Sequence, residues 1–259
     1  MVVVSLTSFP GAIDYAAGAV ESILKGSILP DKIVLYVTMS QFENMEIPLK
    51  LRQLETENHI FEIRNYDREI RSYRKLVPAL KDFPEATIVT IDDDVAYHPN
   101  MLRDLLDLHS KFPSHIIAHR AKHIKPDKPY RQWNKYRWYH FLKKRHQPGF
   151  SNIQTGVGGV LYPPHSLKKE MIDERLFTQL APTADDLWFW AAAVANGRKI
   201  LPVPFGHNKP KGLGKPKELS LKTINFKSGK DRNIEAFNAI LNKYPEIKER
   251  LGERTDGKT

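Results

Sequence analysis

The sequence predicts an α/β protein in which helices flank a mixed, mainly parallel sheet with a doubly wound arrangement. Short runs of β-branched and other apolar residues alternate along the chain with segments whose apolar residues recur at helical spacing. These runs are bounded by Pro, Gly, Asn and Asp, which is typical of buried parallel strands. Ligands of such sheets bind beyond the carboxyl ends of the strands, so polar residues that follow a strand are the first candidates for a site.

The first half of the chain, residues 1–118, is expected to hold five strands and four helices. Apolar runs predict the strands at 2–6, 33–37, 60–63, 87–91 and 116–118. Helices are predicted at 16–27, where apolar residues recur at helical spacing, at 49–56, at 74–81 and directly after Asn100, a favoured N-cap.

The second half, residues 119–259, departs from this alternation. Residues 120–149 predict an insert in which aromatic residues are interleaved with Lys and Arg. A glycine-interrupted strand at 152–162, an apolar helix at 185–196, a strand at 200–203 and a last helix at 234–241 are expected after it. We expect a mobile Gly-, Lys- and Pro-rich segment at 208–232 and a frayed tail at 252–259. The chain has no internal repeat, and we expect a single domain over 1–259.

Composition places the chain among ordinary globular proteins, at 259 residues with 41% hydrophobic and 10% aromatic content. No apolar run approaches the roughly 18 residues of a membrane span, and the opening residues lack the features of a signal peptide. The absence of cysteine excludes disulfides and thiolate metal sites. We therefore expect a cytoplasmic protein.

The net charge of +10 is concentrated in two segments. Residues 120–145 contain ten Lys and Arg against Asp127 alone, a net charge of +9. Residues 209–232 contain eight against Glu218 and Asp231, a net charge of +6. Two basic segments on a mildly acidic remainder indicate an anionic partner, which the charge alone leaves open among nucleic acid, anionic lipid and a phosphorylated substrate.

Three consecutive aspartates, Asp92 to Asp94, follow the predicted strand 87–91. If the strand continued through them, Asp92 and Asp94 would face one way and Asp93 the other. Two carboxylates on one side repel each other unless a cation lies between them, and oxygen ligands suit Mg²⁺ or Mn²⁺. A solvated turn after the strand explains the same residues, so the motif alone leaves both interpretations open.

Together with a second acidic pair, this motif resembles the GT-A-fold nucleotide-sugar-dependent glycosyltransferases. The second pair is Asp185-Asp186, which begins the predicted helix after a glycine-rich strand. Further segments in the expected order are Ser5 to Pro10, Pro30 to Ile33, Tyr73 to Leu76, and Thr155 to Val160. The resemblance covers residues 2–207 and is closest to small bacterial enzymes that build surface polysaccharide or lipopolysaccharide. Many inverting members have Glu-Asp at the second pair, whereas this chain has Asp185-Asp186. This difference leaves open which of the two residues is the base.

The resemblance implies a GT-A (Rossmann-like) domain whose nucleotide-binding half is 1–118 and whose acceptor-side half is 119–259. It implies that Asp94 binds the metal, that Asp92 reaches the ribose or a metal-bound water, and that His207 is a third ligand or a diphosphate contact. Asp186, and second Asp185, are the implied bases that take the acceptor proton. The alternative for this pair is that it only caps the helix.

Further residues are implied contacts of the two substrates. Those expected at the nucleotide sugar are Thr7, Phe9, Lys75, Asp92, Asp93, Gly158, Gly159, Lys211 and Lys215. Trp133 and Trp138 in the insert are expected to stack on acceptor sugars or to lie at a membrane interface, unless the aromatic residues are simply core.

We therefore expect a metal-dependent glycosyltransferase that uses Mn²⁺ or Mg²⁺. It would move a sugar from a nucleotide sugar, such as a UDP-sugar, to a glycan or lipid-linked acceptor by single displacement with inversion, in bacterial surface polysaccharide biosynthesis. Peripheral contact with the anionic inner face of the membrane is expected. One alternative is a sugar nucleotidyltransferase, although Ser5 to Gly11 lacks the usual glycine-rich phosphate loop. Another is a nucleic-acid-binding module, which we do not expect because the aspartates would repel phosphate.

Overall fold

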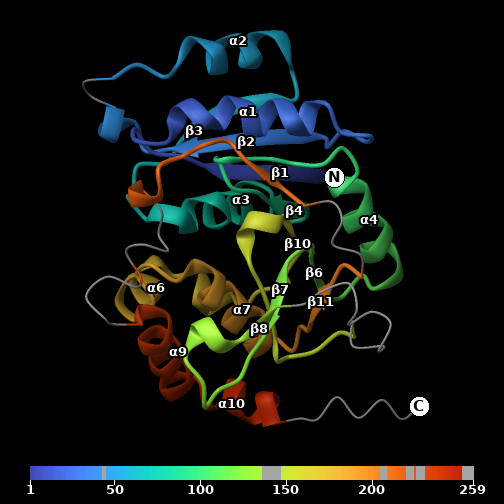
Figure 1. Ribbon diagram of the computed structural model, residues 1–259, viewed down its shortest axis with the longest axis vertical. Helices are drawn as coiled ribbons and strands as arrows, with labels where there is room; N and C mark the ends of the chain where they lie inside the picture. The colour runs from blue at the N-terminus through green and yellow to red at the C-terminus, as the bar shows by residue number, and fades with distance from the viewer. Residues whose placement is uncertain (43–44, 136–146, 205–208, 220–224, 226–230, 253–259) are drawn as a thin grey trace.

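The computed structural model describes residues 1–42, 45–135, 147–204, 209–219, 225 and 231–252. A seven-stranded sheet in the order β11-β6-β10-β4-β1-β2-β3 forms its centre, with helices on both faces (Figure 1). Its strands are β1 (Val2–Thr7), β2 (Lys32–Val37), β3 (Phe61–Asn65), β4 (Thr87–Thr90), β6 (Ile116–Ala118), β10 (Val160–Tyr162) and β11 (Ile200–Pro202). The strand β10 runs antiparallel to both of its neighbours, and the other pairs of this sheet are parallel. The expected α/β fold with a mixed, mainly parallel sheet is confirmed.

The helices divide between the two faces of the sheet. The α-helices are α1 (Ile13–Leu24), α2 (Leu49–Glu57), α3 (Val77–Asp82), α4 (Met101–Lys111), α6 (Glu174–Leu180), α7 (Asp185–Ala195), α9 (Arg232–Lys243) and α10 (Pro245–Gly252). The 3₁₀ helices are η1 (Met39–Phe42), η2 (Arg71–Lys75), η3 (Tyr130–Gln132), η4 (Gly156–Gly158), η5 (Lys169–Ile172) and η6 (Lys217–Leu219). One core lies under α1, α2 and α4, and the other lies under α3, α6, α7, α9 and α10.

The strand β1 shows why the sheet is buried on both sides. Its residue Val3 belongs to one core and its neighbour Val4 belongs to the other, because successive side chains of a strand point to opposite faces. A strand covered on both faces needs a continuous apolar run rather than an alternating one. The apolar run at 2–6 is therefore typical of a central parallel strand.

The helix α7 is the most deeply buried helix of the second core. Its apolar residues extend all round, as expected of a helix enclosed by other elements. Each buried indole finds a partner for its N–H: Trp188 donates to the carbonyl of Met171 at 2.7 Å, and Trp190 donates to that of Phe150 at 2.8 Å. These two hydrogen bonds anchor α7, whose first turn carries Asp185 and Asp186.

Two small sheets complete the fold. One has the order β8-β7-β9, with β7 (Ala121–His123), β8 (Asn134–Lys135) and β9 (Asn152–Gln154). The other pairs β5 (Val95–Ala96) with β12 (Lys211–Gly212). The second sheet ties part of the basic segment 208–232 to the residues directly after the three aspartates.

Several expected elements differ from the structure. The strand expected at 152–162 is wrong as one strand, because its halves β9 and β10 belong to different sheets and η4 separates them. The helix expected at 74–81 is split into η2 and α3, with Pro78 in the first turn of α3. The small strands β5, β7, β8 and β12, and the helices α6 and α10, were not expected. They are short, and short elements carry little periodicity.

Among the residues that the structure describes, no helix is both long and apolar enough to cross a membrane.

Candidate functional site

The candidate site lies where the connections of the central sheet diverge. From β1 the chain goes to β2 and β3 on one side and then returns to β4 on the other side of β1. Such a switch point opens a crevice at the carboxyl ends of the strands. Ser8 follows β1 and Asp92 to Asp94 follow β4 at this edge. Because β10 is antiparallel to β4, its beginning and the preceding η4 lie at the same edge.

The three aspartates do not continue the strand. The strand β4 ends at Thr90, the Asp92 N–H donates to the hydroxyl of Tyr97 at 2.9 Å, and the chain turns over Asp93 and Asp94 into β5. The expected alternation, with Asp92 and Asp94 on one side, is therefore wrong. Instead, the carboxylates of Asp93 and Asp94 share one partner and that of Asp92 has another.

The shared partner of Asp93 and Asp94 is the Lys215 ammonium. Its Nζ lies 2.7 Å from Asp94 Oδ2 and 3.3 Å from Asp93 Oδ1. The other oxygen of Asp93 accepts a hydrogen bond of 2.5 Å from the Ser8 hydroxyl. Burial raises the pKa of Asp93 to about 6, although Lys215 and Ser8 both favour its charged form. We call Asp93, Asp94 and Lys215 the outer cluster.

A second ammonium, that of Lys75, joins the sheet edge to α7. Its Nζ lies 3.0 Å from Asp92 Oδ1 and 3.1 Å from Asp185 Oδ2. Burial opposes the charge of Lys75, but the carboxylates of Asp185 and Asp92 raise its pKa well above the usual value. The expected role of Lys75 was contact with the nucleotide, whereas in this structure its ammonium is engaged by two carboxylates.

Asp186 completes this group, which we call the inner cluster: Lys75, Asp92, Asp185 and Asp186. Its Oδ1 accepts a hydrogen bond of 3.0 Å from the Gly156 N–H. Burial, and then the neighbouring charge of Asp185, raise the pKa of Asp186 to about 7. Three carboxylates thus surround one ammonium, and one of the three titrates near neutral pH.

Gly156 is a site residue that the sequence analysis missed. A Cβ at this position would lie 2.6 Å from Lys75 Nζ, 3.2 Å from Asp186 Oδ1 and 3.3 Å from Asp92 Oδ1. Its backbone can approach all three groups only because it has no side chain. The clustering of glycines at 156–159 was the available signal, although the expectation fell on the later two.

The helix-capping alternative for Asp185 and Asp186 does not describe the structure. The N-cap of α7 is Ala184, and it makes no side-chain capping bond. Both aspartates instead lie in the first turn, where the helix dipole favours negative charge. Their side chains serve Lys75 and Gly156.

Gly158 and Gly159 were expected at the nucleotide sugar, but close packing against neighbouring residues already explains why each is a glycine. A Cβ on Gly158 would lie 2.7 Å from the Cβ of Arg120. Gly159 has φ of 89°, and a Cβ there would lie 2.9 Å from the Met101 sulfur. These close approaches hold the η4 turn against the connection after β6 and against α4.

Thr7, the last residue of β1, and Phe9, which lies just after that strand, were the expected nucleotide contacts. Both lie at the same edge, and their polar groups form hydrogen bonds within the chain. The Thr7 hydroxyl donates to the carbonyl of Tyr36 at 2.8 Å and accepts from Arg74 Nε at 2.8 Å. The carbonyl of Phe9 accepts hydrogen bonds from the N–H groups of Ala12 and Ile13, at the start of α1. The fully buried Arg74 also donates to the carbonyl of Ser8 at 2.7 Å, so it fixes the end of β1. Sequence reasoning missed Arg74, because a surface lysine or arginine gives the same local pattern.

The other expected residues are placed as follows. Trp133 is 2% exposed, donates its indole N–H to the carbonyl of Lys128 at 3.0 Å, and packs edge-on against Phe237. The expectation that Trp133 stacks on an acceptor is therefore wrong, since its ring belongs to the core. Lys211 is exposed on β12. His207 and Trp138 lie outside the described residues.

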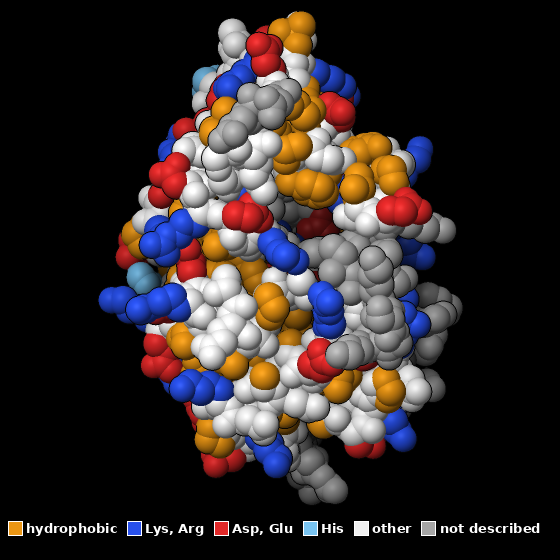
Figure 2. All heavy atoms as spheres, turned by 90° about the vertical axis from the view of Figure 1, so that its left-hand side faces the viewer, with side chains coloured by type: hydrophobic (Ala, Val, Ile, Leu, Met, Phe, Trp, Pro, Cys, Tyr) orange, Lys and Arg blue, Asp and Glu red, His pale blue; other side chains and the backbone are white. Residues whose placement is uncertain are grey.

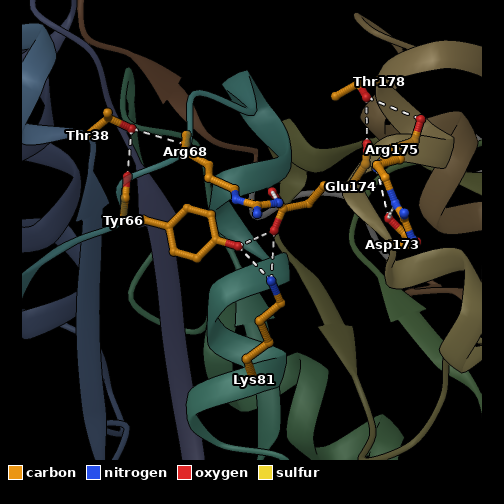
Figure 3. A network of polar contacts seen from close by, with 8 residues as sticks. All are labelled: Thr38, Tyr66, Arg68, Lys81, Asp173, Glu174, Arg175 and Thr178. Atoms are coloured by element: carbon orange, nitrogen blue, oxygen red, sulfur yellow. Dashed lines mark hydrogen bonds and ion pairs between the residues drawn. The ribbon is translucent and has the colours of Figure 1, made fainter.

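A further polar network lies on another part of the molecule. Glu174 at the start of α6 accepts hydrogen bonds from the Tyr66 hydroxyl, from Lys81 at 2.8 Å and from Arg68 at 3.2 Å (Figure 3). Although burial opposes it, hydrogen bonds from Lys81 and Tyr66 lower the pKa of Glu174. The network joins the start of α6 to α3 and to the residues that follow β3.

The outer cluster provides ligands for a divalent cation but does not enclose one. Among the residues that the structure describes, no group of three or more His, Cys, Asp or Glu is arranged to hold a metal. Asp93 and Asp94 supply two neighbouring carboxylates, and Mg²⁺ is commonly bound by one or two carboxylates with substrate phosphates and water. The residues therefore fit a cation that is completed by a phosphorylated ligand. Figure 2 shows a hollow near the middle of one face, with acidic side chains in it and Lys or Arg side chains at its rim.

Comparison with models of known protein families gives no match. Comparison with curated proteins gives none either.

Proposed function

We propose that this protein is a metal-dependent glycosyltransferase of the GT-A type, which transfers a sugar from a UDP-sugar to a glycan or lipid-linked acceptor with inversion. One observation carries the proposal: carboxylates from two elements far apart in sequence, Asp92 to Asp94 after β4 and Asp185-Asp186 on α7, meet at the switch point of the sheet. Glycosyl transfer with inversion needs carboxylates that hold a cation at the leaving diphosphate. It also needs another carboxylate that takes the proton of the acceptor hydroxyl.

The outer cluster is assigned to the diphosphate. Asp93 and Asp94 would hold the cation, and Ser8 fixes Asp93 by a hydrogen bond of 2.5 Å. When bound, Mn²⁺ or Mg²⁺ neutralises the charge that develops on the diphosphate as the glycosidic bond breaks. This assignment moves the second carboxylate from Asp92, as the sequence suggested, to Asp93.

The inner cluster is assigned to the acceptor. A general base works best when its pKa is close to the operating pH, and burial raises that of Asp186 to about 7. Asp185 Oδ2 lies 3.1 Å from the Lys75 ammonium, so this oxygen is already engaged by a cation. The structure thus favours Asp186 over Asp185 as the group that takes the proton of the acceptor hydroxyl.

A screen of nucleotide sugars tests the proposal. The purified protein is incubated with UDP-, GDP- and dTDP-sugars, with Mn²⁺, with Mg²⁺ and with EDTA, and the release of nucleotide and the anomeric form of the sugar are followed by NMR. We expect slow, metal-dependent hydrolysis of a UDP-sugar with inverted product. Failure to bind or cleave any donor with either metal would contradict the proposal, and salt-sensitive binding of single-stranded DNA in its place would favour the nucleic-acid alternative.

A further inference from the structure

The Lys215 ammonium occupies the place where a cation would bind the outer cluster. It contacts one oxygen of each carboxylate, at 2.7 Å for Asp94 and 3.3 Å for Asp93. Its side chain is only 14% exposed, so the contact is enclosed rather than a chance meeting at the surface. An ammonium and a divalent cation cannot both remain between the same two carboxylates, because they repel each other and use the same oxygens.

The fold delivers Lys215 to this place through the two-stranded sheet. The strand β12 pairs with β5, which begins directly after Asp94, and the Leu213 N–H donates to the Asp94 carbonyl at 2.8 Å. The side chain of Leu213 packs on α1, where a Cβ on Gly18 would lie 3.0 Å from it. The backbone is thus fixed two residues before Lys215, while the four-carbon side chain of Lys215 can change rotamer without moving it.

We infer that Lys215 is a competitor, carried by the chain itself, for the divalent cation of the outer cluster. The inference rests on the proposed function. Without nucleotide, the ammonium neutralises Asp93 and Asp94 and lowers the affinity of the site for free metal. A nucleoside diphosphate offers the displaced ammonium an anionic partner, so metal and nucleotide bind together. Lys215 thereby restricts metal binding to the complex in which the metal is needed.

Binding of Mn²⁺ alone, measured by electron paramagnetic resonance, tests this inference directly. Lys215→Ala, and Lys215→Met, which keeps the length of the side chain, should each bind Mn²⁺ at least about tenfold more tightly than the wild type in the absence of nucleotide, because the competing group is gone. Addition of UDP should raise the Mn²⁺ affinity by a larger factor in the wild type than in either variant. Asp94→Asn in the Lys215→Ala background should abolish the gain, which locates the metal.

Lys209→Ala is the matched control. Lys209 is an exposed lysine of the same segment, and its removal changes the net charge equally. It should leave the Mn²⁺ affinity unchanged. Equal affinity in the wild type and both Lys215 variants, or weaker binding by the variants, would overturn the inference.

These outcomes separate the inference from the proposed function. Equal Mn²⁺ affinities together with cleavage of a UDP-sugar by the wild type would overturn the competition and leave the function standing. Tighter Mn²⁺ binding by the Lys215 variants without binding of any nucleotide sugar would support the competition and contradict the function.

Discussion

The inner and outer clusters have the same composition in outline, a lysine between aspartates, yet the fold uses them differently. Lys75 comes from η2 and lies between the sheet edge and α7, enclosed by three carboxylates and the backbone of Gly156. Lys215 comes from a peripheral segment that pairs with only two residues of β5. An ammonium that joins two core elements is part of the structure, whereas one on a peripheral segment can be exchanged for another cation. The ion pairs of the two lysines are alike. We therefore expect the part of the fold that carries each lysine to decide its role, structural for Lys75 and exchangeable for Lys215.

The largest expected effect is the loss of metal binding in the outer cluster. Asp94→Asn should nearly abolish transfer and Mn²⁺-dependent binding of UDP, because it removes one of two carboxylates at the cation position. Isothermal titration with UDP, with and without Mn²⁺, measures this. Thermal unfolding should be nearly unchanged, since Asp94 is partly exposed. Unchanged Mn²⁺-dependent UDP affinity would remove the metal from the outer cluster.

The next effect concerns the base in the inner cluster. Asp186→Asn should lower kcat by on the order of 10² to 10⁴ while leaving UDP and Mn²⁺ binding nearly normal, because the base is needed only as the acceptor attacks. Steady-state kinetics beside donor titration measure this. Asp185→Asn is the comparison: it should mainly reduce stability, because Asp185 is a partner of Lys75. If Asp185→Asn were the inactive variant and Asp186→Asn the mild one, the two roles would be exchanged.

Stability should distinguish the two lysines. Lys75→Met should cost about 3–5 kcal/mol of unfolding free energy, because it leaves buried carboxylates without a counter-charge. Lys215→Met should cost clearly less, since the Lys215 side chain is the more exposed of the two, at 14% against 8% for Lys75, and it comes from a peripheral segment. Urea denaturation of both variants measures the difference. Equal losses would show that Lys215 is as structural as Lys75 and would contradict the different roles given to the two lysines.

The pH dependence of the reaction should follow Asp186. A base must be unprotonated, so kcat/KM should fall about tenfold per unit below pH 7 and level off above it. The free energy of unfolding should change with pH in the opposite direction to the activity. The pKa of Asp186 rises from 3.8 to about 7 on folding, so the folded chain binds the extra proton and stability falls as pH rises through this range. Asp186→Asn should therefore be more stable than the wild type at pH 8, and a loss of stability there would contradict the shifted pKa.

The smallest effect is expected at the described part of the basic insert, 120–135. We expect exposed cations there to bind anionic vesicles, each contributing about 1 kcal/mol that salt weakens. The double variant Lys128→Glu, Lys135→Glu should reduce co-sedimentation with phosphatidylserine vesicles. Lys111→Glu with Lys243→Glu, at exposed lysines on α4 and α9, should reduce it less. Co-sedimentation that is indifferent to anionic lipid and to salt would exclude the membrane contact.

Not every Lys or Arg of the insert contributes to a basic surface, as Lys122 shows. Lys122 is buried, with its Nζ 3.4 Å above the ring of Tyr130, and burial lowers its pKa to about 8. It belongs to the interior of the small sheet rather than to a basic surface. The same correction applies to Trp133, whose aromatic neighbours suggested a binding platform. Composition identified the residue types, but only the packing showed which of them face solvent.

The central strands, most of the long helices, one acidic motif after a central strand and another at the start of a helix could be predicted from the sequence. These follow from local signals: a buried strand needs a continuous apolar run, and a helix repeats every 3.6 residues. The tertiary structure alone decided which residues the motifs contact. Asp92 pairs with Lys75, and Asp93 with Lys215, because the chain turns after Thr90 and receives one ammonium from η2 and the other from the segment that follows β12. A pairing between segments this far apart depends on how the layers pack, so no local pattern specifies it.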